Sequence, residues 1–478
     1  MLLKPCTTTK ERGFFVFGNQ VNAAAASCLN KDIMKEIWNG FCYLSSEIEI
    51  TTIQDNVLVI GDAQLPALEG YAYAINITQS GVALVARDEQ SLIHGYFTLL
   101  EHIEAVNPES GSSTFRIACA SIKDKPAIGN RMIHFCVFPE TTAEFIEKFI
   151  KICGSMKYNY FIIEFWGMLQ FDCLKELGWE SSFTKDQIRK FVTLANDLGI
   201  EVIPFFNHWG HATGCRDQFG KHVVLDQNPH LHYLFDHTGY IWNIERKDVR
   251  ELMKKIRREL IELCGNGRYF HIGCDEAGYY SGEKALKMAE ILIDYTKEIA
   301  DDLEALGRRP IMWGDMLMHK AKVNKSEQDK NGYFCNCPDE EMSGQLLSRV
   351  DRRIIIADWQ YSAKEYPVAT SLFLKELGFD VISCSYDYAS QNIHACAETV
   401  KHCNLLGFMH TTWHTLHSGM ACVAFGAASG WHETYLPNTE HRWDTLEEPA
   451  ALMRKIHFAN GDYKNAGWAP IQTGMGIS

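Results

Sequence analysis

The sequence of 478 residues lacks several features that mark large classes of protein. No apolar run approaches the roughly 18 to 20 residues that a membrane span needs, and residues 1–19 show no charged head followed by an apolar signal core. Acidic and basic residues are mixed, the formal net charge is −14, and no basic block occurs, so we expect no nucleic-acid partner. These absences predict a soluble, cytoplasmic protein.

Metal and phosphate motifs are also scarce. The two cysteines of "FCNCP", Cys335 and Cys337, have no second ligand pair, and "NHWGH" offers His208 and His211 without a third ligand at a recognisable spacing. Sixteen cysteines are scattered, many inside apolar stretches, which favours buried thiols in a reducing compartment over a disulfide framework. We therefore expect no metal and no cofactor, with a metal-dependent hydrolase as an alternative that chelation would test.

Apolar and aromatic residues are plentiful. The chain is 46% hydrophobic, enough for a large core, and its length suggests two domains. It contains 11 Trp, 19 Tyr and 26 Phe. Many of these rings belong in a core, but aromatic faces also suit the apolar faces of sugar rings.

From about residue 121 the chain alternates short apolar runs with amphipathic helical patterns. We expect strands at residues 131–137, 160–165, 201–206, 269–273, 310–314, 353–358, 380–385 and 406–411. A helix is expected between them at residues 184–199, for example, with Thr184 as N-cap and Gly199 as its end. Eight such units are typical of a (β/α)8 TIM barrel within the α/β class. An open doubly wound sheet is disfavoured, because no Gly-rich phosphate loop follows the first strand.

Residues 1–120 read differently. Strand-like stretches at 57–62 and 71–88 precede a helical pattern at 89–106, and no catalytic cluster is evident. We predict a small α+β domain over residues 1–120 and a catalytic barrel with a C-terminal tail over residues 121–478.

Polar and aromatic residues follow most of the expected barrel strands, and barrel chemistry sits at the carboxyl ends of strands. This set comprises Glu164, Trp166, Asn207, His208, His211, Asp275, Glu276, Trp313, Asp315, Asp358, Trp359, Tyr386, Asp387, Tyr388, His410 and Trp413. Acids and aromatics that converge on one mouth indicate a sugar pocket.

"YFHIGCDEAG" at residues 269–278 resembles the His-x-Gly-Gly-Asp-Glu signature of family 20 glycoside hydrolases, the β-N-acetylhexosaminidases, with Cys274 in place of the second Gly. Three further pieces agree in order and spacing: "KPAIGNRMIHF", "MKYNYFIIEF" and "FTKDQIRKFVTLANDLGIEVIPFFNHWGHA". The similarity covers most of residues 60–420, so an ordered set of motifs carries it.

The resemblance implies a retaining exo-glycosidase that removes a terminal β-linked N-acetylhexosamine, with the sugar's own acetamido carbonyl as the nucleophile. Asp275 would hold the acetamido N–H and stabilise the oxazolinium intermediate, and Glu276 would act as general acid and then base. Because an anion stands beside it and aromatics would bury it, we expect the pKa of Glu276 to be raised.

The resemblance also supplies roles for other residues. Arg131 would bind sugar hydroxyls, His211 would tune the acid, and Tyr386 or Tyr388 would donate to the acetamido oxygen. The full predicted set of substrate contacts is Arg131, Glu164, His211, Trp313, Trp359, Tyr386, Asp387 and Trp413. The expected partner is a small carbohydrate, and the sequence does not indicate an oligomeric state.

Several positions depart from the family pattern. "PFFNHWGH" replaces Pro-Glu-x-Asp-x-Pro-Gly-His, so Phe205 and Asn207 stand where acids are usual. The tryptophan of the eighth strand is followed by His414 and Thr415, and the second strand ends in Glu164. GlcNAc, GalNAc and a substituted sugar therefore stay open. A sulfate or phosphate on the sugar would meet a group of histidines, namely His208, His211, His410 and His414.

Two other functions remain as alternatives. A retaining β-glycosidase could keep Glu276 as acid/base and use Asp387 as covalent nucleophile, with the two carboxyls roughly 5 to 5.5 Å apart. A non-catalytic sugar-binding protein would bind an N-acetyl sugar without turning it over.

Overall fold

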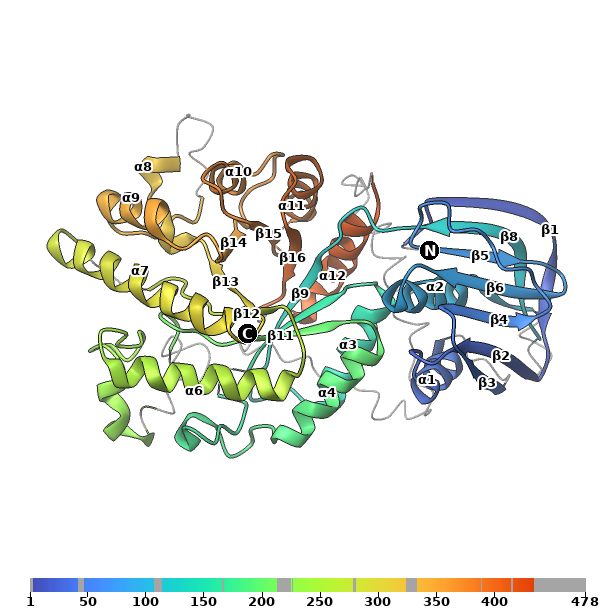
Figure 1. Cartoon of the computed structure of the whole chain (residues 1–478), viewed down its shortest axis with the longest axis horizontal. Coiled ribbons are helices and arrows are strands. Elements are labelled where there is room, and N and C mark those ends of the chain that lie inside the picture. Colours follow the sequence, from blue (N-terminus) through green and yellow to red (C-terminus); the bar gives the residue numbers. More distant parts are fainter. Residues whose placement is uncertain are drawn as a thin grey trace.

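The computed structural model describes residues 3–41, 47–106, 114–165, 167–212, 225, 227–277, 281–323, 333–387, 389–413 and 416–433. The predictions that concern Trp166, Tyr388, His414, Thr415 and the C-terminal tail beyond residue 433 lie outside these residues. The described chain forms a mixed sheet followed by a closed parallel barrel. Figure 1 shows the sheet at one end of an elongated molecule and the barrel at the other. Among the described helices, none combines the length and apolar character that crossing a membrane requires.

The N-terminal sheet has the order β1-β8-β5-β6-β4-β2-β3, and β7 also pairs with β8. Its strands are β1 Thr7–Phe17, β2 Gln20–Ala26, β3 Glu47–Ile53, β4 Val57–Gly61, β5 Tyr73–Ile77, β6 Gly81–Ala86, β7 Ile103–Val106 and β8 Thr114–Asp124. Helices α1 (Lys31–Phe41) and α2 (Glu89–Glu101) pack beside it. The helix expected over 89–106 ends earlier, because Ile103–Val106 pairs with β8 as a strand.

The barrel closes in the order β10-β11-β12-β13-β14-β15-β16-β9, with every neighbouring pair parallel. Its strands are β9 Arg131–Cys136, β10 Tyr160–Glu164, β11 Glu201–Phe205, β12 Tyr269–His271, β13 Arg309–Trp313, β14 Ile355–Trp359, β15 Val381–Ser385 and β16 Gly407–Thr411. The predicted (β/α)8 barrel is therefore confirmed, with strand ends within about two residues of those expected.

Helices surround the barrel and alternate with its strands. They are α3 Ala143–Ser155, α4 Lys185–Asp197, α6 Lys247–Cys264, α7 Glu283–Glu304, α8 Lys320–Val323, α9 Glu340–Arg349, α10 Ala369–Glu376, α11 Ser390–Cys403 and α12 Leu416–Trp431, with short 3-10 turns at Lys175–Leu177, Pro229–Leu234 and Asp315–Leu317. Thr184 caps α4 through a reciprocal capping box with Gln187, as the sequence predicts. Gly199 takes a φ of +71° just after this helix, a conformation that suits glycine.

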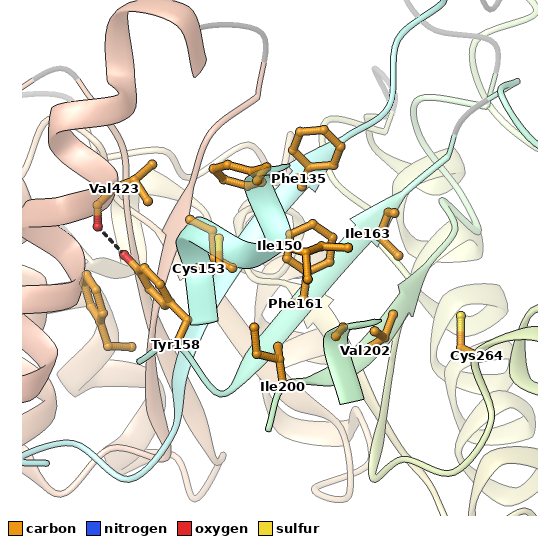
Figure 2. Close-up of a cluster of buried hydrophobic side chains, with 14 of the residues drawn as sticks. Phe135, Ile150, Cys153, Tyr158, Phe161, Ile163, Ile200, Val202, Cys264 and Val423 are labelled. Carbon is orange, nitrogen blue, oxygen red and sulfur yellow. Dashed lines mark hydrogen bonds between the residues drawn. The ribbon is translucent and has the colours of Figure 1, made fainter. Parts of the chain in front are cut away.

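A continuous apolar layer joins the strands to the helices. Figure 2 shows Phe135, Phe161 and Ile163 of the barrel wall with Ile150 and Cys153 of α3. The hydroxyl of Tyr158 donates to the carbonyl of Val423 on α12 at 2.6 Å, which ties the first barrel turn to the last helix.

Inside the barrel a second apolar cluster fills the space between strands. Met132, Tyr160, Ile203 and Ile311 belong to it and are buried. Towards the carboxyl ends of the strands, the inward positions change to aromatic and polar residues, and the candidate site lies there.

Candidate active site

The backbone after β12 makes an unusual turn that presents two consecutive acids, Asp275 and Glu276, hereafter the carboxylate pair. Gly273, Cys274 and Glu276 have positive φ values of 65°, 73° and 47°. Successive residues of a regular strand point to opposite faces. The left-handed turns break that alternation, so the two carboxylates can meet one common partner.

That common partner is His211, in the loop after β11. Its Nε2 lies 3.1 Å from Glu276 Oε2 and 3.4 Å from Asp275 Oδ2. The loop sits tightly on the carboxylate pair, because a Cβ at Gly210 would lie 2.0 Å from the backbone oxygen of Asp275. His211 itself has a φ of +52°. Glycine at position 210 therefore permits the close approach that brings His211 to the acids.

A third acid fixes the position of Glu276. Asp315, after β13, accepts a hydrogen bond from the backbone N–H of Glu276 at 3.0 Å. The same carboxylate accepts from the side chains of Asn336, at 2.9 Å, and Trp359, at 3.2 Å. Asn336 lies inside "FCNCP", so that segment contributes an amide that holds Asp315.

The two carboxylates differ sharply in environment. The side chain of Asp275 is 8% exposed and that of Glu276 is 47% exposed. Burial, followed by the negative charges of Asp315, Glu276 and Glu164, raises the pKa of Asp275 to about 7 against the opposing effect of His211. Burial likewise raises the pKa of Asp315 to about 6.

Glu276 behaves in the opposite way to our prediction. The hydrogen bond from His211 lowers its pKa, and this effect exceeds the desolvation that would raise it. The expected raised pKa is therefore wrong for Glu276 in the free protein. The raised value belongs to its neighbour, since Asp275 is the residue that the fold buries among acids.

Aromatic side chains cluster beside these acids, and one of them, Trp359, bonds to Asp315. This aromatic wall consists of Trp313, Trp359, Tyr361, Tyr386 and Trp413. The Nε1–H of Trp413 donates to the hydroxyl of Tyr361 at 2.7 Å. The rings of Tyr361 and Tyr386 lie 4.9 Å apart, and those of Trp313 and Trp413 lie 5.7 Å apart. The structure thus brings together four predicted residues and adds Tyr361, which the inward two-residue spacing from Trp359 could have revealed.

Glu164 is the last residue of β10. In the closed barrel it lies across the mouth from Trp359, the last residue of β14. It is buried, and its Oε1 accepts from the Nδ2 of Asn207 at 2.7 Å. Its charge reaches Asp275, whose pKa it helps to raise. Asp387 follows β15, and its carboxylate lies against Gly419 of α12, where an added Cβ would be 2.8 Å from Oδ2.

Arg131 does not join this site. It is the first residue of β9, at the amino end of the barrel, and its guanidinium donates to the carbonyls of Lys157, Ile128 and Gly129. It also stacks over Trp431, 4.9 Å from the ring. This placement contradicts the sugar-binding role predicted from the resemblance, because the carboxyl ends of the strands carry the carboxylate pair.

The proposed histidine group is also not assembled. His208 is fully buried and packs against Phe206 and Phe270, and His410 bonds to Ser385 on the neighbouring strand. Burial lowers the pKa of His410 to about 3, which keeps its imidazole neutral. Of the four histidines, His211 alone among the described residues reaches the carboxylate pair, so a histidine-lined pocket for a charged substituent is not supported.

Comparison with known proteins agrees with this geometry. Residues 167–413 match the family described as "Glycosyl hydrolase family 20, catalytic domain". Lacto-N-biosidase of Bifidobacterium bifidum is 23% identical over 346 residues, which cover 66% of this chain and 29% of that protein. Hexosaminidase D of Bos taurus is 23% identical over 232 residues, which cover 46% of this chain and 59% of that protein. Each match therefore spans less than two thirds of the relative's own length.

Solved structures show the same fold. The β-N-acetylhexosaminidase from Bacteroides fragilis superposes with a TM-score of 0.68 at 15% identity, covering 95% of both chains. Because the family's catalytic domain matches just over half of the sequence and contains the carboxylate pair, the chain belongs to glycosyl hydrolase family 20.

Proposed function

We propose that this chain is a retaining exo-glycosidase that removes terminal β-linked N-acetylhexosamine, GlcNAc or GalNAc, by substrate-assisted catalysis. The observation that carries the proposal is the contrast within the carboxylate pair. Asp275 is buried, and among the described residues its Oδ1 has no hydrogen-bond partner. Glu276 is half exposed and held by His211.

The unpartnered oxygen of Asp275 suits an amide N–H of the ligand. A buried carboxylate oxygen without a donor is costly, and the acetamido N–H of a sugar would supply one. Such a hydrogen bond orients the amide so that its carbonyl oxygen can attack the anomeric carbon. Ionised Asp275 would then stabilise the positive charge that develops on the oxazolinium ring.

Glu276 is the more exposed of the two acids, so it is suited to meet the leaving group. In the free protein its lowered pKa and its hydrogen bond with His211 favour the ionised carboxylate of Glu276. Substrate that covers the half-exposed carboxylate would desolvate it and raise its pKa, so that Glu276 takes up a proton. Glu276 would then donate this proton to the glycosidic oxygen and later accept one from water.

The aromatic wall supplies the sugar platform. The Nε1–H of Trp313 has no hydrogen-bond partner among the described residues, and neither does the Oδ1 of Asn207. Both atoms are buried and polar. A sugar hydroxyl can accept a hydrogen bond from the Nε1–H of Trp313, and another can donate one to the Oδ1 of Asn207. The faces of the aromatic rings would cover the apolar side of the pyranose.

A panel of nitrophenyl β-glycosides with and without the 2-acetamido group tests this proposal. We expect turnover only with the acetamido group, and strong inhibition by thiazoline analogues of the oxazolinium intermediate. Glu276→Gln should lower kcat by about 10²-fold or more with the fold intact, whereas the exposed Glu376→Gln, on α10, should not. Equal hydrolysis of a plain β-glucoside, or a covalent sugar ester on any side chain, would refute the mechanism.

A further inference from the structure

Three potential metal ligands converge inside the barrel mouth, apart from the carboxylate pair. His134 and Cys136 are alternate residues of β9, and Glu164 ends the neighbouring strand β10. The register pairs Glu164 with Cys136, and Ile162 with His134. Because alternate residues share a face, all three side chains point inward, with Cys136 and Glu164 at the same level and His134 two residues earlier on β9. We name these residues the His-Cys-Glu cluster.

The spacing within this cluster fits a bound cation. The Sγ of Cys136 lies 3.4 Å from Glu164 Oε2 and 3.8 Å from His134 Nε2, and the latter two atoms are 3.7 Å apart. A point equidistant from these three atoms lies about 2.1 Å from each, close to the 2.0–2.3 Å of zinc bonds to nitrogen, oxygen and sulfur.

The imidazole of His134 has no close nitrogen or oxygen partner on either ring nitrogen among the described residues. It is fully buried, and its Nδ1 has no hydrogen-bond partner among the described residues. Its Nε2 is 3.7 Å or more from the cluster's carboxylate and thiol, too far for a good hydrogen bond to oxygen. Nε2, and not the unpartnered Nδ1, is the ring nitrogen that faces the thiol and the carboxylate, and an imidazole nitrogen in that place can coordinate a metal.

A hydrogen bond from Asn207 orients the carboxylate of Glu164 in the cluster. The Nδ2 of Asn207 donates to Glu164 Oε1 at 2.7 Å, which leaves Oε2 turned towards Cys136 and His134. Outer hydrogen bonds of this kind fix the ligands of metal sites. We propose that the His-Cys-Glu cluster binds a zinc-like divalent transition metal.

The donor types decide the class of ion. Imidazole and thiolate suit zinc and its neighbours in the first transition row and disfavour magnesium and calcium, which prefer oxygen. Three protein ligands leave a fourth position for water. Binding converts the Cys136 thiol to a thiolate, so one proton is released to solvent for each ion bound.

This site takes no direct part in the proposed reaction, although Glu164 helps to raise the pKa of Asp275. The cluster sits against the aromatic wall, since the rings of His134 and Trp413 are 4.5 Å apart. A cation there would neutralise Glu164 and hold β9 against β10, so it would support the pocket without touching the glycosidic bond. Neither "FCNCP" nor "NHWGH" contributes a ligand, which is why their spacing gives no signal of it.

Metal binding is measurable without turnover. Protein stripped by a chelator and dialysed against metal-free buffer would be titrated with Zn²⁺ by calorimetry, and bound metal counted after gel filtration. We expect one tight equivalent per chain, and a thiolate-to-metal absorption band with Co²⁺. Cys136→Ser and Glu164→Gln should each weaken Zn²⁺ binding by about 10-fold or more.

The matched control is Cys384→Ser, which changes another buried, inward-facing thiol of the same barrel. It should keep both the stoichiometry and the cobalt band. The absence of a saturable equivalent, unchanged binding in Cys136→Ser and Glu164→Gln, or equal loss in Cys384→Ser would overturn the assignment. Glu276→Gln should still bind Zn²⁺, so failure of the glycosidase proposal and failure of this one give different results.

Discussion

Asp275 and Glu276 are neighbours of the same chemical class, yet the fold gives them opposite electrostatics. Burial among Asp315 and Glu164 raises the pKa of Asp275 to about 7, while the hydrogen bond from His211 lowers the pKa of Glu276. The free protein therefore holds protons more tightly on the buried acids Asp275 and Asp315 than on Glu276. A ligand that donates to Asp275 and covers Glu276 would reverse this distribution.

Asp275 should cost the protein stability above neutral pH. Its ordinary pKa of 3.8 applies in the unfolded chain, and the folded value is about 7. The folded state therefore binds the proton more tightly, and the free energy of unfolding falls as pH rises between those values. We expect Asp275→Asn to be more stable than the parent at pH 8 by on the order of 1–3 kcal/mol, with a smaller difference at pH 5.

Urea denaturation at both pH values measures this difference, with Glu376→Gln as the surface control. Asp315, whose pKa is about 6, contributes with the same sign, so part of the pH dependence remains in the variant. A variant that is less stable than the parent at pH 8 would contradict the account.

The barrel strands could be predicted because they are buried on both faces and read as short apolar runs. The same property hides which face points inward. The sequence therefore could not show that His208 and His410 lie on the outer side of the barrel. Nor could it show that His134 and Cys136 point into the barrel. The N-terminal strand β1 was not expected, because most of its side chains are exposed and it has no apolar alternation.

The signature around Asp275 and Glu276 identified the central acids and the family. It could not give their pKa values, because these depend on Asp315 and His211, which come from other strands. Arg131 was assigned wrongly for another reason: the expected strand at residues 131–137 already begins with it, at the amino end, and its sugar-binding role came from the resemblance alone.

The loop after β11 should be intolerant of even a methyl group at Gly210. An added Cβ would meet the backbone oxygen of Asp275 at 2.0 Å, so the loop must move and carry His211 away from Glu276. We expect Gly210→Ala to lower kcat/KM by about 10²-fold, as misplacement by roughly 1 Å does elsewhere.

Steady-state kinetics and melting curves would test this, with Gly344→Ala on α9 as control because its Cβ meets nothing within 4 Å. In a His211→Ala background the same change should cost much less, since the loop then has no histidine to misplace. An equal loss in both backgrounds would show that the loop acts by another route.

The two parts of the molecule meet at a buried charged cluster. This interdomain cluster contains Tyr73 and Asp124 of the N-terminal sheet and Thr98 of α2, with Lys157 and Trp431 of the barrel part. Lys157 Nζ lies 3.6 Å from Asp124 Oδ2 and 4.3 Å from the centre of the Trp431 ring. We propose that the predicted small domain and the barrel unfold together because this cluster joins them.

Removing one charge from this cluster should destabilise the whole protein. Lys157→Met removes the ammonium that pairs with buried Asp124, and breaking a buried ion pair costs about 3–5 kcal/mol. Lys287→Met, which breaks an exposed pair with Glu245, should cost less than about 1 kcal/mol. Adding Asp124→Asn to Lys157→Met should restore much of the loss.

Equilibrium unfolding followed by both tryptophan fluorescence and circular dichroism measures these costs. Coincident transitions by the two probes are expected for a single cooperative unit. Separate transitions, or no recovery in the double variant, would refute the joint unfolding of the two parts.

The mouth of the barrel also concentrates left-handed backbone at residues that are not glycine, namely His211, Cys274, Glu276 and Trp413. Each such residue costs of order 1 kcal/mol or more. A laboratory selection for heat tolerance would therefore favour substitutions that remove the strain at these positions. Such substitutions would lower activity while they raise the stability of the fold. A ligand that binds at the mouth should, for the same reason, stabilise the strained backbone and raise the melting temperature.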